Sequence, residues 1–198
     1  MEHDDSMRDL SALLSRATLG AAIAAHGAQK LYGWFDGPGI EGTTGMMGTL
    51  GFDPPERYAR LSALTEIAAG TLIASGTLGP VGPALLASVM TTAVGSVHLK
   101  NGFWNKDQGF ELNTMYGLAA LLLAANGYGR PSVDQITGLR GKTTPLLGVL
   151  AIAGGVGGAV FMLSRRRARP PAEESMKQAS SRTPSETGTV ERQHARET

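Results

Sequence analysis

Long apolar segments alternate with short polar ones through the first 163 residues of the chain. A helix needs roughly 20 apolar residues to cross about 30 Å of hydrocarbon, and runs of that length are rare in soluble helical bundles. The pattern therefore predicts an all-α membrane protein. The candidate spans cover residues 12–34, 61–79, 81–99, 112–129 and 146–163.

The connections between these segments also carry a pattern. Residues 79–83, Gly-Pro-Val-Gly-Pro, join the second and third spans, and so short a turn predicts that the two helices are antiparallel neighbours. Ahead of the second span, glycine recurs at every third position from residue 39 to residue 51. This spacing predicts a short interfacial or re-entrant element with one small-residue face, which ends at Asp53-Pro54-Pro55.

The last span, residues 146–163, contains no charged residue and is followed by Ser-Arg-Arg-Arg. Gly154 and Gly158 form a G-x-x-x-G pair within it, which predicts the close approach of another helix backbone. From Ser164 onward the chain is polar and charged and has almost nothing to bury, which predicts a disordered tail.

Composition narrows the classes of function. The mean hydropathy of −0.05 averages the apolar spans with the polar tail, and a net charge of +1 is too small for a nucleic-acid-binding surface. The chain has no cysteine, which excludes disulfides, thiol redox chemistry and thiolate metal sites within it. No hydrolase elbow, phosphate loop or dinucleotide-binding motif is present in the sequence.

Ionisable residues interrupt the apolar spans. A charge near the centre of a bilayer costs about 3 kcal/mol on insertion scales, so such groups usually pair with one another or mark a functional site. In the first span the ionisable residues share one helix face with glycines, which suits a helix that faces protein rather than lipid. The residues on this face are Arg16, Gly20, His26, Gly27 and Lys30.

The other spans carry ionisable residues that reach the same depth. Lys30, His98 and Glu111 lie at span ends that face one side of the membrane. Glu66 lies about 7–8 Å deep from that side, at 1.5 Å per helical residue. With His26 one turn deeper than Lys30, these groups can meet in one polar layer. The candidate polar site therefore consists of Lys30, His26, Glu66, His98, Glu111 and Arg16.

Simpler interpretations of these residues stay open at the level of sequence. Lys30 and Glu66 could be an ion pair that only holds two helices in register, or Lys30 could extend to the lipid headgroups. His98 and Glu111 could be loop residues, because the segment between their spans is polar. Neither the H-x-x-x-H nor the E-x-x-H spacing occurs among His26, Glu66, His98 and Glu111, so no metal site is predicted from them.

Taken in order along the chain, these residues resemble the DoxX family of small membrane proteins. The resemblance runs from Arg16 through HGAQKL (26–31), GTTGMMGTLGF (42–52) and GYGRPSVD (127–134). The family motif falls on Gly27, Gly42, Thr43, Gly70, Gly102, Phe103, Gly109, Gly127, Gly129, Ser132 and Asp134.

The resemblance implies a four-helix transmembrane bundle and, with it, a division of the chain. A polar N-terminal segment (1–10) precedes the DoxX-like membrane domain (11–138). An additional transmembrane helix (144–163) and a disordered charged tail (164–198) follow, and the resemblance implies nothing about their role.

The function implied by the resemblance is redox chemistry at the plasma membrane. Some DoxX proteins are subunits of a membrane thiosulfate:quinone oxidoreductase, and others anchor a complex that links superoxide detoxification with thiol metabolism. The expected protein is thus a multi-pass, quinone- or sulfur-linked redox component. In it Lys30 would hold a substrate oxygen, Glu66 would pair with Lys30, and His98 with Glu111 would relay protons. The alternatives are a non-catalytic scaffold for soluble redox enzymes and, less expected, a small oligomeric transporter.

Overall fold

The structure is a computed structural model that describes residues 2–139 and 144–166. Within these ranges the secondary structure consists of helices, turns and loops, which confirms the predicted all-α class. The charged tail predicted for residues 164–198 lies outside the described residues except for Ser164, Arg165 and Arg166.

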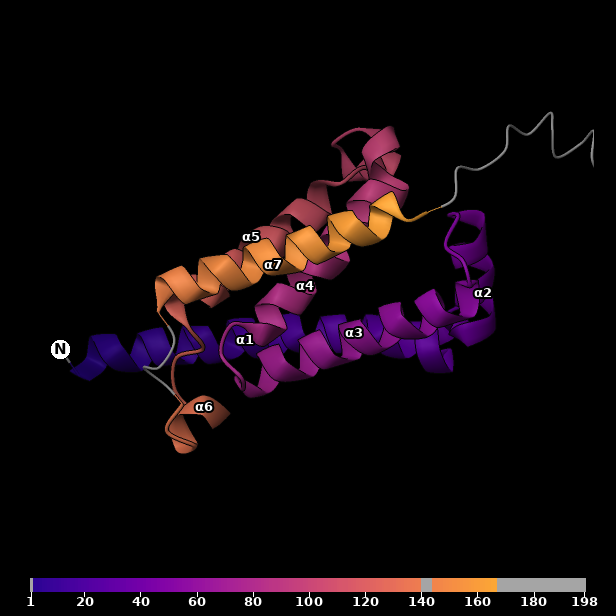
Figure 1. The fold of residues 1–198 in the computed structure, drawn as a ribbon. Coiled ribbons are helices and arrows are strands. Elements are labelled where there is room, and N and C mark those ends of the chain that lie inside the picture. The colour runs from indigo at the N-terminus through magenta and orange to yellow at the C-terminus, as the bar shows by residue number, and fades with distance from the viewer. Residues whose placement is uncertain (1, 140–143, 167–198) are drawn as a thin grey trace, which may run out of the picture. The chain divides into compact units, whose positions relative to one another are not determined.

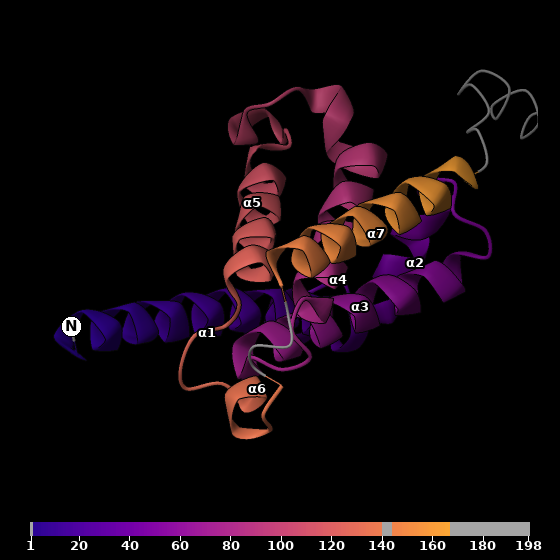
Figure 2. The same ribbon diagram turned by 60° about the vertical axis from the view of Figure 1, so that its left-hand side comes forward.

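Two long helices form the base of the fold (Figures 1 and 2). Helix α1 (Glu2–Tyr32) and helix α3 (Pro55–Ser75) pack side by side, and the short helix α2 (Gly39–Thr49) connects them at one end. Glycines allow the two helices to approach closely. A Cβ atom on Gly20 would lie 2.5 Å from the Gly70 carbonyl oxygen, and one on Gly27 would lie 2.7 Å from the Ala63 carbonyl oxygen. The glycine face predicted for the first span therefore does face protein.

The second half of the fold crosses this pair. Helix α4 (Val81–Ala93) continues into a π-helical turn (Val94–His98) and a 3-10 turn (Leu99–Asn101), and helix α5 (Glu111–Asn126) packs against α4. Figure 2 shows α4 and α5 standing steeply across α1. After the single-turn helix α6 (Val133–Ile136), helix α7 (Pro145–Ser164) packs on both α4 and α5.

The turn between α3 and α4 differs from the sequence prediction. Helix α3 ends at Ser75 because Gly76 adopts the left-handed conformation, with φ of 68°, that closes the helix. The connection therefore occupies residues 76–80, and Gly82 and Pro83 lie in the first turn of α4. Proline fits there because the first helical N–H groups have no partner within the helix.

The glycines predicted to make close helix contacts, in residues 39–51 and in the last span, do not all make them. Residues 39–49 do form a short helix, but its buried side chains are Thr43 and Met47, and a Cβ on Gly45 would meet open space. In α7, a Cβ on Gly154 or Gly158 would likewise meet nothing among the described residues. Close packing of α7 instead uses Gly148 against Ala124 and Gly155 against Ala84.

Two helices of the described residues are long and apolar enough to cross a membrane, namely Val81–Asn101 and Pro145–Ser164. In their most apolar stretches only 22% and 11% of the residues are buried, so apolar side chains face outward, as they would toward lipid. Helix α5 has 16 residues and rises about 24 Å, which is shorter than the predicted span. The spans over α1, α3 and α5 stay predictions.

Candidate functional site

A cavity of about 410 Å³ lies between the α1–α3 pair and the helices that cross it. This volume is within the range of sites for small molecules, which are typically apolar with a few polar groups. The apolar part of the lining includes Ile23, Met46, Met47, Leu50, Phe52, Leu61, Val89, Met90, Leu112 and Met162. The polar part includes His26, Lys30, Ser62, Glu66, Ser88, Thr92, Ser96, His98 and Asn113.

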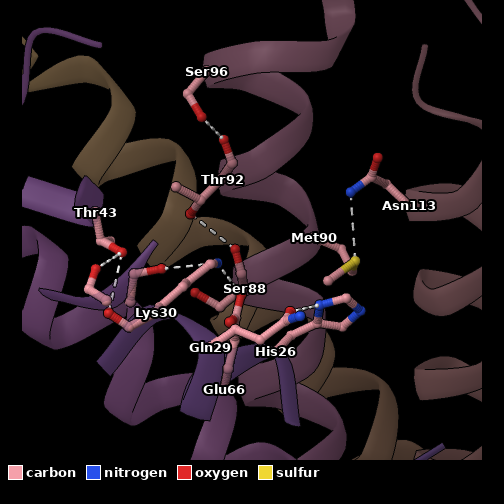
Figure 3. Close-up of polar contacts among 12 residues, drawn as sticks. His26, Gln29, Lys30, Thr43, Glu66, Ser88, Met90, Thr92, Ser96 and Asn113 are labelled. Atoms are coloured by element: carbon pink, nitrogen blue, oxygen red, sulfur yellow. Dashed lines mark hydrogen bonds and ion pairs between the residues drawn. The ribbon is translucent and has the colours of Figure 1, made fainter. Parts of the chain in front are cut away.

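Lys30 and Glu66 form an ion pair within this lining (Figure 3). Lys30 lies in the last turn of α1, and its Nζ atom is 2.5 Å from Oε1 of Glu66 in the middle of α3. The two side chains are 25% and 5% exposed. Lys30 Nζ also donates to Ser62 Oγ at 3.4 Å, so one of its three N–H groups has no protein acceptor among the described residues.

The second carboxylate oxygen of Glu66 has no such partner. Oε2 is buried and accepts no hydrogen bond from the described residues. A buried polar atom without a partner costs about 1–3 kcal/mol, and the great majority of such atoms in proteins are satisfied. The pair thus offers a ligand two complementary groups, an N–H donor on Lys30 and a charged acceptor on Glu66.

His26 lines the cavity one turn before Lys30. Its Nδ1 atom is 3.0 Å from Oε1 of Gln29, which leaves Nε2 for other partners. Asn113 on α5 donates to the Met90 sulfur at 3.5 Å, and Figure 3 shows both residues on the same side of the cavity as the imidazole. His26 therefore lines the same cavity as the ion pair.

Three hydroxyl side chains, two on α4 and one on the π-helical turn that continues it, form a row along the cavity (Figure 3). Thr92 donates to the Ser88 carbonyl oxygen at 2.9 Å, and Ser96 donates to the Thr92 carbonyl oxygen at 2.5 Å. All three residues line the cavity. Because the Thr92 and Ser96 protons point back at the helix, the hydroxyl oxygens are left as acceptors for water or a ligand.

His98 ends this row at the π-helical turn. Its Nδ1 atom is 2.7 Å from the Gln108 carbonyl oxygen, and Asn101 donates to the same oxygen at 3.2 Å. These contacts hold the 102–110 loop against α4. The close approach of Gly109 to Gly102 and the edge contacts of Phe103 with Trp104 and Phe110 shape the same loop.

Glu111 and Arg16 lie outside the cavity lining. Glu111 Oε2 accepts from the Asn105 backbone N–H at 2.9 Å, so it closes the loop before α5. Arg16 is buried far along α1 from Lys30 and donates to the carbonyl oxygens of Ala74 and Pro131. The structure thus brings together four of the six candidate polar residues, Lys30, His26, Glu66 and His98.

The last motif of the resemblance supports the turn that follows α3. Asp134 accepts from the backbone N–H groups of Leu78 at 2.8 Å and Gly79 at 2.7 Å, and Ser132 caps α6. Gly127 and Gly129 both have positive φ in the preceding loop. Tyr128 lies between them, and burial, reinforced by Asp134, raises the pKa of its phenol well above the ordinary value.

The other motif residues also have packing roles. Thr43 Oγ1 donates to the Gly39 carbonyl oxygen at 2.7 Å and to the Lys30 carbonyl oxygen at 3.1 Å, which fixes α2 against α1. A Cβ on Gly42 would lie 2.9 Å from Pro38, and Gly70 has Ala24 in direct contact.

Sequence reasoning missed most of the cavity wall. Ser88, Thr92 and Ser96 repeat at every fourth position, so helical periodicity could have identified their common face. Met162 and Asn113 gave no such signal, because their position depends on how α5 and α7 cross the other helices. Among the described residues, no group of three or more His, Cys, Asp or Glu side chains could hold a metal ion.

Residues 11–99 match the sequence model of the DoxX family. This segment is a DoxX domain. It runs from within α1 through α4 and the π-helical turn, whereas α5, α6 and α7 lie beyond the match. Comparison with curated proteins and with solved structures found no match. The DoxX domain and the exposed apolar helices indicate a protein that resides in a lipid bilayer.

Proposed function

We propose that this DoxX protein is a redox-associated membrane component that binds a quinone head group beside Lys30 and Glu66. The observation that carries the proposal is the unpartnered Oε2 atom of Glu66, next to a partly free ammonium, in a mostly apolar cavity. A quinone carbonyl would accept from Lys30, and a quinol hydroxyl would donate to Glu66. The apolar walls would surround the ring and the start of its tail.

The charges favour a quinone over a small sulfur oxyanion. A dianion beside Lys30 would also lie beside the Glu66 carboxylate, and the surrounding apolar walls would not solvate it. A neutral quinone avoids this repulsion and still uses both polar groups. The chain would contribute binding and proton transfer, while a partner oxidoreductase with its own redox group would exchange the two electrons.

The row of hydroxyls supplies a route for the protons. A proton that Glu66 accepts from a quinol would move through water held by Ser88, Thr92 and Ser96 toward His98. In this route His98 keeps the relay role that the resemblance suggested, and Glu111 does not take part because it closes the loop before α5.

We also propose that the DoxX-like domain extends over residues 11–138 as a four-helix membrane bundle and that α7 adds a fifth span at the plasma membrane. Reporter fusions after residues 57, 105, 140 and 180 would count the spans. Two of the five spans lie between residues 57 and 105, so five crossings predict the same reporter activity at 57, 105 and 180 and the opposite activity at 140, and any other pattern contradicts them.

The binding test uses decylubiquinone with the full-length protein in lipid nanodiscs and isothermal titration calorimetry. Loss of one charge-assisted hydrogen bond, about 1.5–3 kcal/mol, corresponds to at least a tenfold weaker affinity. We expect Lys30→Ala to weaken binding of the oxidised quinone and Glu66→Gln to weaken binding of the reduced quinol. Lys106→Ala and Glu41→Gln remove exposed charges and serve as matched controls.

Failure of both redox forms to bind would refute the quinone proposal and leave the alternative, a membrane scaffold for soluble redox enzymes. That alternative rests on residues after Arg166, because Arg165 stacks on Phe161 and Arg166 contacts Gly95 and Phe52. A pull-down that loses its partners when residues 167–198 are removed would support it.

A further inference from the structure

The last turn of α7 reaches the cavity although α7 lies outside the DoxX match. Met162 lines the cavity, and Met162 and Leu163 pack on the buried cluster of Met47, Phe52 and Ala59. A Cβ on Gly95 would lie 2.5 Å from Cδ1 of Leu163, so the absence of a side chain at position 95 is what lets α7 settle on the π-helical turn.

Arg166 ties this turn to two other parts of the cavity. Its Nη2 atom donates to the Gly95 carbonyl oxygen at 3.1 Å, and its Nε atom donates to the Leu163 carbonyl oxygen at 3.4 Å. Its guanidinium also lies 5.6 Å from the centre of the Phe52 ring. One side chain thus connects α7, the π-helical turn and the loop before α3, and each of these segments contributes to the cavity lining.

We propose that Met162 is a specificity-determining residue of the cavity and that Arg166 is the positioning residue that holds it there. The inference rests on the cavity being the ligand site of the proposed function, but not on the ligand being a quinone. The plain alternative is that Arg166 only marks the end of a span, where a basic residue reaches the headgroups.

The absence of cysteine in the chain allows a test that needs no ligand. A thiol introduced by Met162→Cys would face a cavity with polar groups and water, whereas one introduced by Val160→Cys, on an exposed apolar face of α7, would face lipid. Maleimides react with the thiolate, which does not form in hydrocarbon, so N-ethylmaleimide should label position 162 about tenfold faster than position 160.

Variants of Arg166 and Arg165 distinguish a residue that positions Met162 from one that only places a positive charge at the end of the span. In the Met162→Cys background, Arg166→Ala should change the labelling rate by about threefold or more, Arg166→Lys should give an intermediate value, and Arg165→Ala should have no effect. Arg165 is the matched control because its guanidinium lies over the ring of Phe161, a residue of the same helix. Position 160 should keep its rate throughout, and an increase there would indicate general loosening and overturn the assignment.

Specificity is tested with two quinones that share a one-isoprene tail and differ in the ring, ubiquinone-1 with a benzoquinone and menaquinone-1 with a naphthoquinone. We expect Met162→Ala to raise the preference for the bulkier ring, while Val160→Ala leaves it unchanged. Equal labelling at positions 160 and 162 would overturn the inference. If the labelling pattern holds but neither quinone binds, the proposed function fails and the positioning role stands.

Discussion

The Nζ atom of Lys30 lies 2.5 Å from Oε1 of Glu66, and this contact joins the end of α1 to the middle of α3. One carboxylate oxygen of Glu66 is paired, and the other accepts no hydrogen bond from the described residues. The stability of the two helices and the ligand binding proposed above therefore depend on the same pair.

Removing Lys30 should destabilise the protein more than removing both partners. Lys30→Ala leaves a buried carboxylate without its cation, and we expect a loss of about 1–3 kcal/mol in the free energy of unfolding. The double variant Lys30→Ala/Glu66→Ala should recover much of that loss. Unfolding in detergent micelles measures the stability of the single and the double variant.

Lys106→Ala, which breaks an exposed pair with Asp107, is the control and should change stability by less than about 1 kcal/mol. Additive losses in the double variant would show that the two charges do not interact.

Gly70→Ala should weaken the packing of α1 on α3. The new methyl group would collide with the backbone of Ala24 and Gly20, and overpacking of this kind costs about 1–3 kcal/mol. Gly45→Ala is the control, because its methyl group meets open space and alanine is the better helix former by about 1 kcal/mol. Thermal unfolding should therefore move in opposite directions for the two variants. A similar loss of thermal stability in both variants would show that position 70 does not require glycine for the close packing of the two helices.

Tyr128 should make stability fall at high pH. Burial raises the pKa of the folded phenol, so above the ordinary tyrosine pKa of about 10 the unfolded chain releases a proton that the folded chain keeps. The unfolded state then binds fewer protons, and the free energy of unfolding decreases as pH rises. Tyr128→Phe lacks this loss, so its stability relative to wild type should increase between about pH 9 and pH 11.

At neutral pH, Tyr128→Phe should be neutral or slightly stabilising, because it removes a buried hydroxyl that has no partner among the described residues. Tyr32→Phe, at an exposed tyrosine, should show no pH-dependent difference from wild type. A pH-independent difference for Tyr128→Phe would mean that the phenol ionises in the folded state as easily as in water.

The contact between α7 and the π-helical turn can be locked by a disulfide. A Cβ on Gly95 would lie 3.6 Å from Cγ of Leu163, so the pair Gly95→Cys/Leu163→Cys is close enough to bridge, and it removes the leucine that a Cβ would strike. Because the native chain has no cysteine, any bridge within one chain must join these two positions, and a bridge between two chains would migrate as a dimer. Electrophoresis with and without reductant should detect it. The control pair Gly95→Cys/Val160→Cys should stay reduced, and bridging in both would mean that α7 does not hold one position.

The sequence was most informative where one helix determines the outcome. Gly20, Gly27 and Lys30 share a face by helical periodicity alone, and apolar surroundings made Glu66 stand out as a partner. Periodicity misplaced Arg16, which is on the same face but 14 residues from Lys30, about 21 Å along the axis. Sharing a face therefore did not bring Arg16 to the cavity.

Positions that depend on several helices were not predictable in this way. Met162 and Asn113 reach the cavity only because α5 stands steeply across α1 and α7 packs on α4 and α5, and no local pattern encodes this arrangement. The α3–α4 turn was placed three residues late, because the glycine that ends α3 is Gly76 rather than Gly79. Gly76 and Gly79 could each have ended the helix, and only the backbone conformation shows which of them does.

The division of the cavity wall has a consequence for shortened forms of the chain. The ion pair and the hydroxyl row come from the segment up to residue 99, while Asn113 and Met162 come from α5 and α7. A protein that stopped after Asn101 would keep its charged groups but lose the cover over them. Acyl chains of the surrounding bilayer would then fill the space, so the charged groups would be preserved without the side chains of α5 and α7 that cover them.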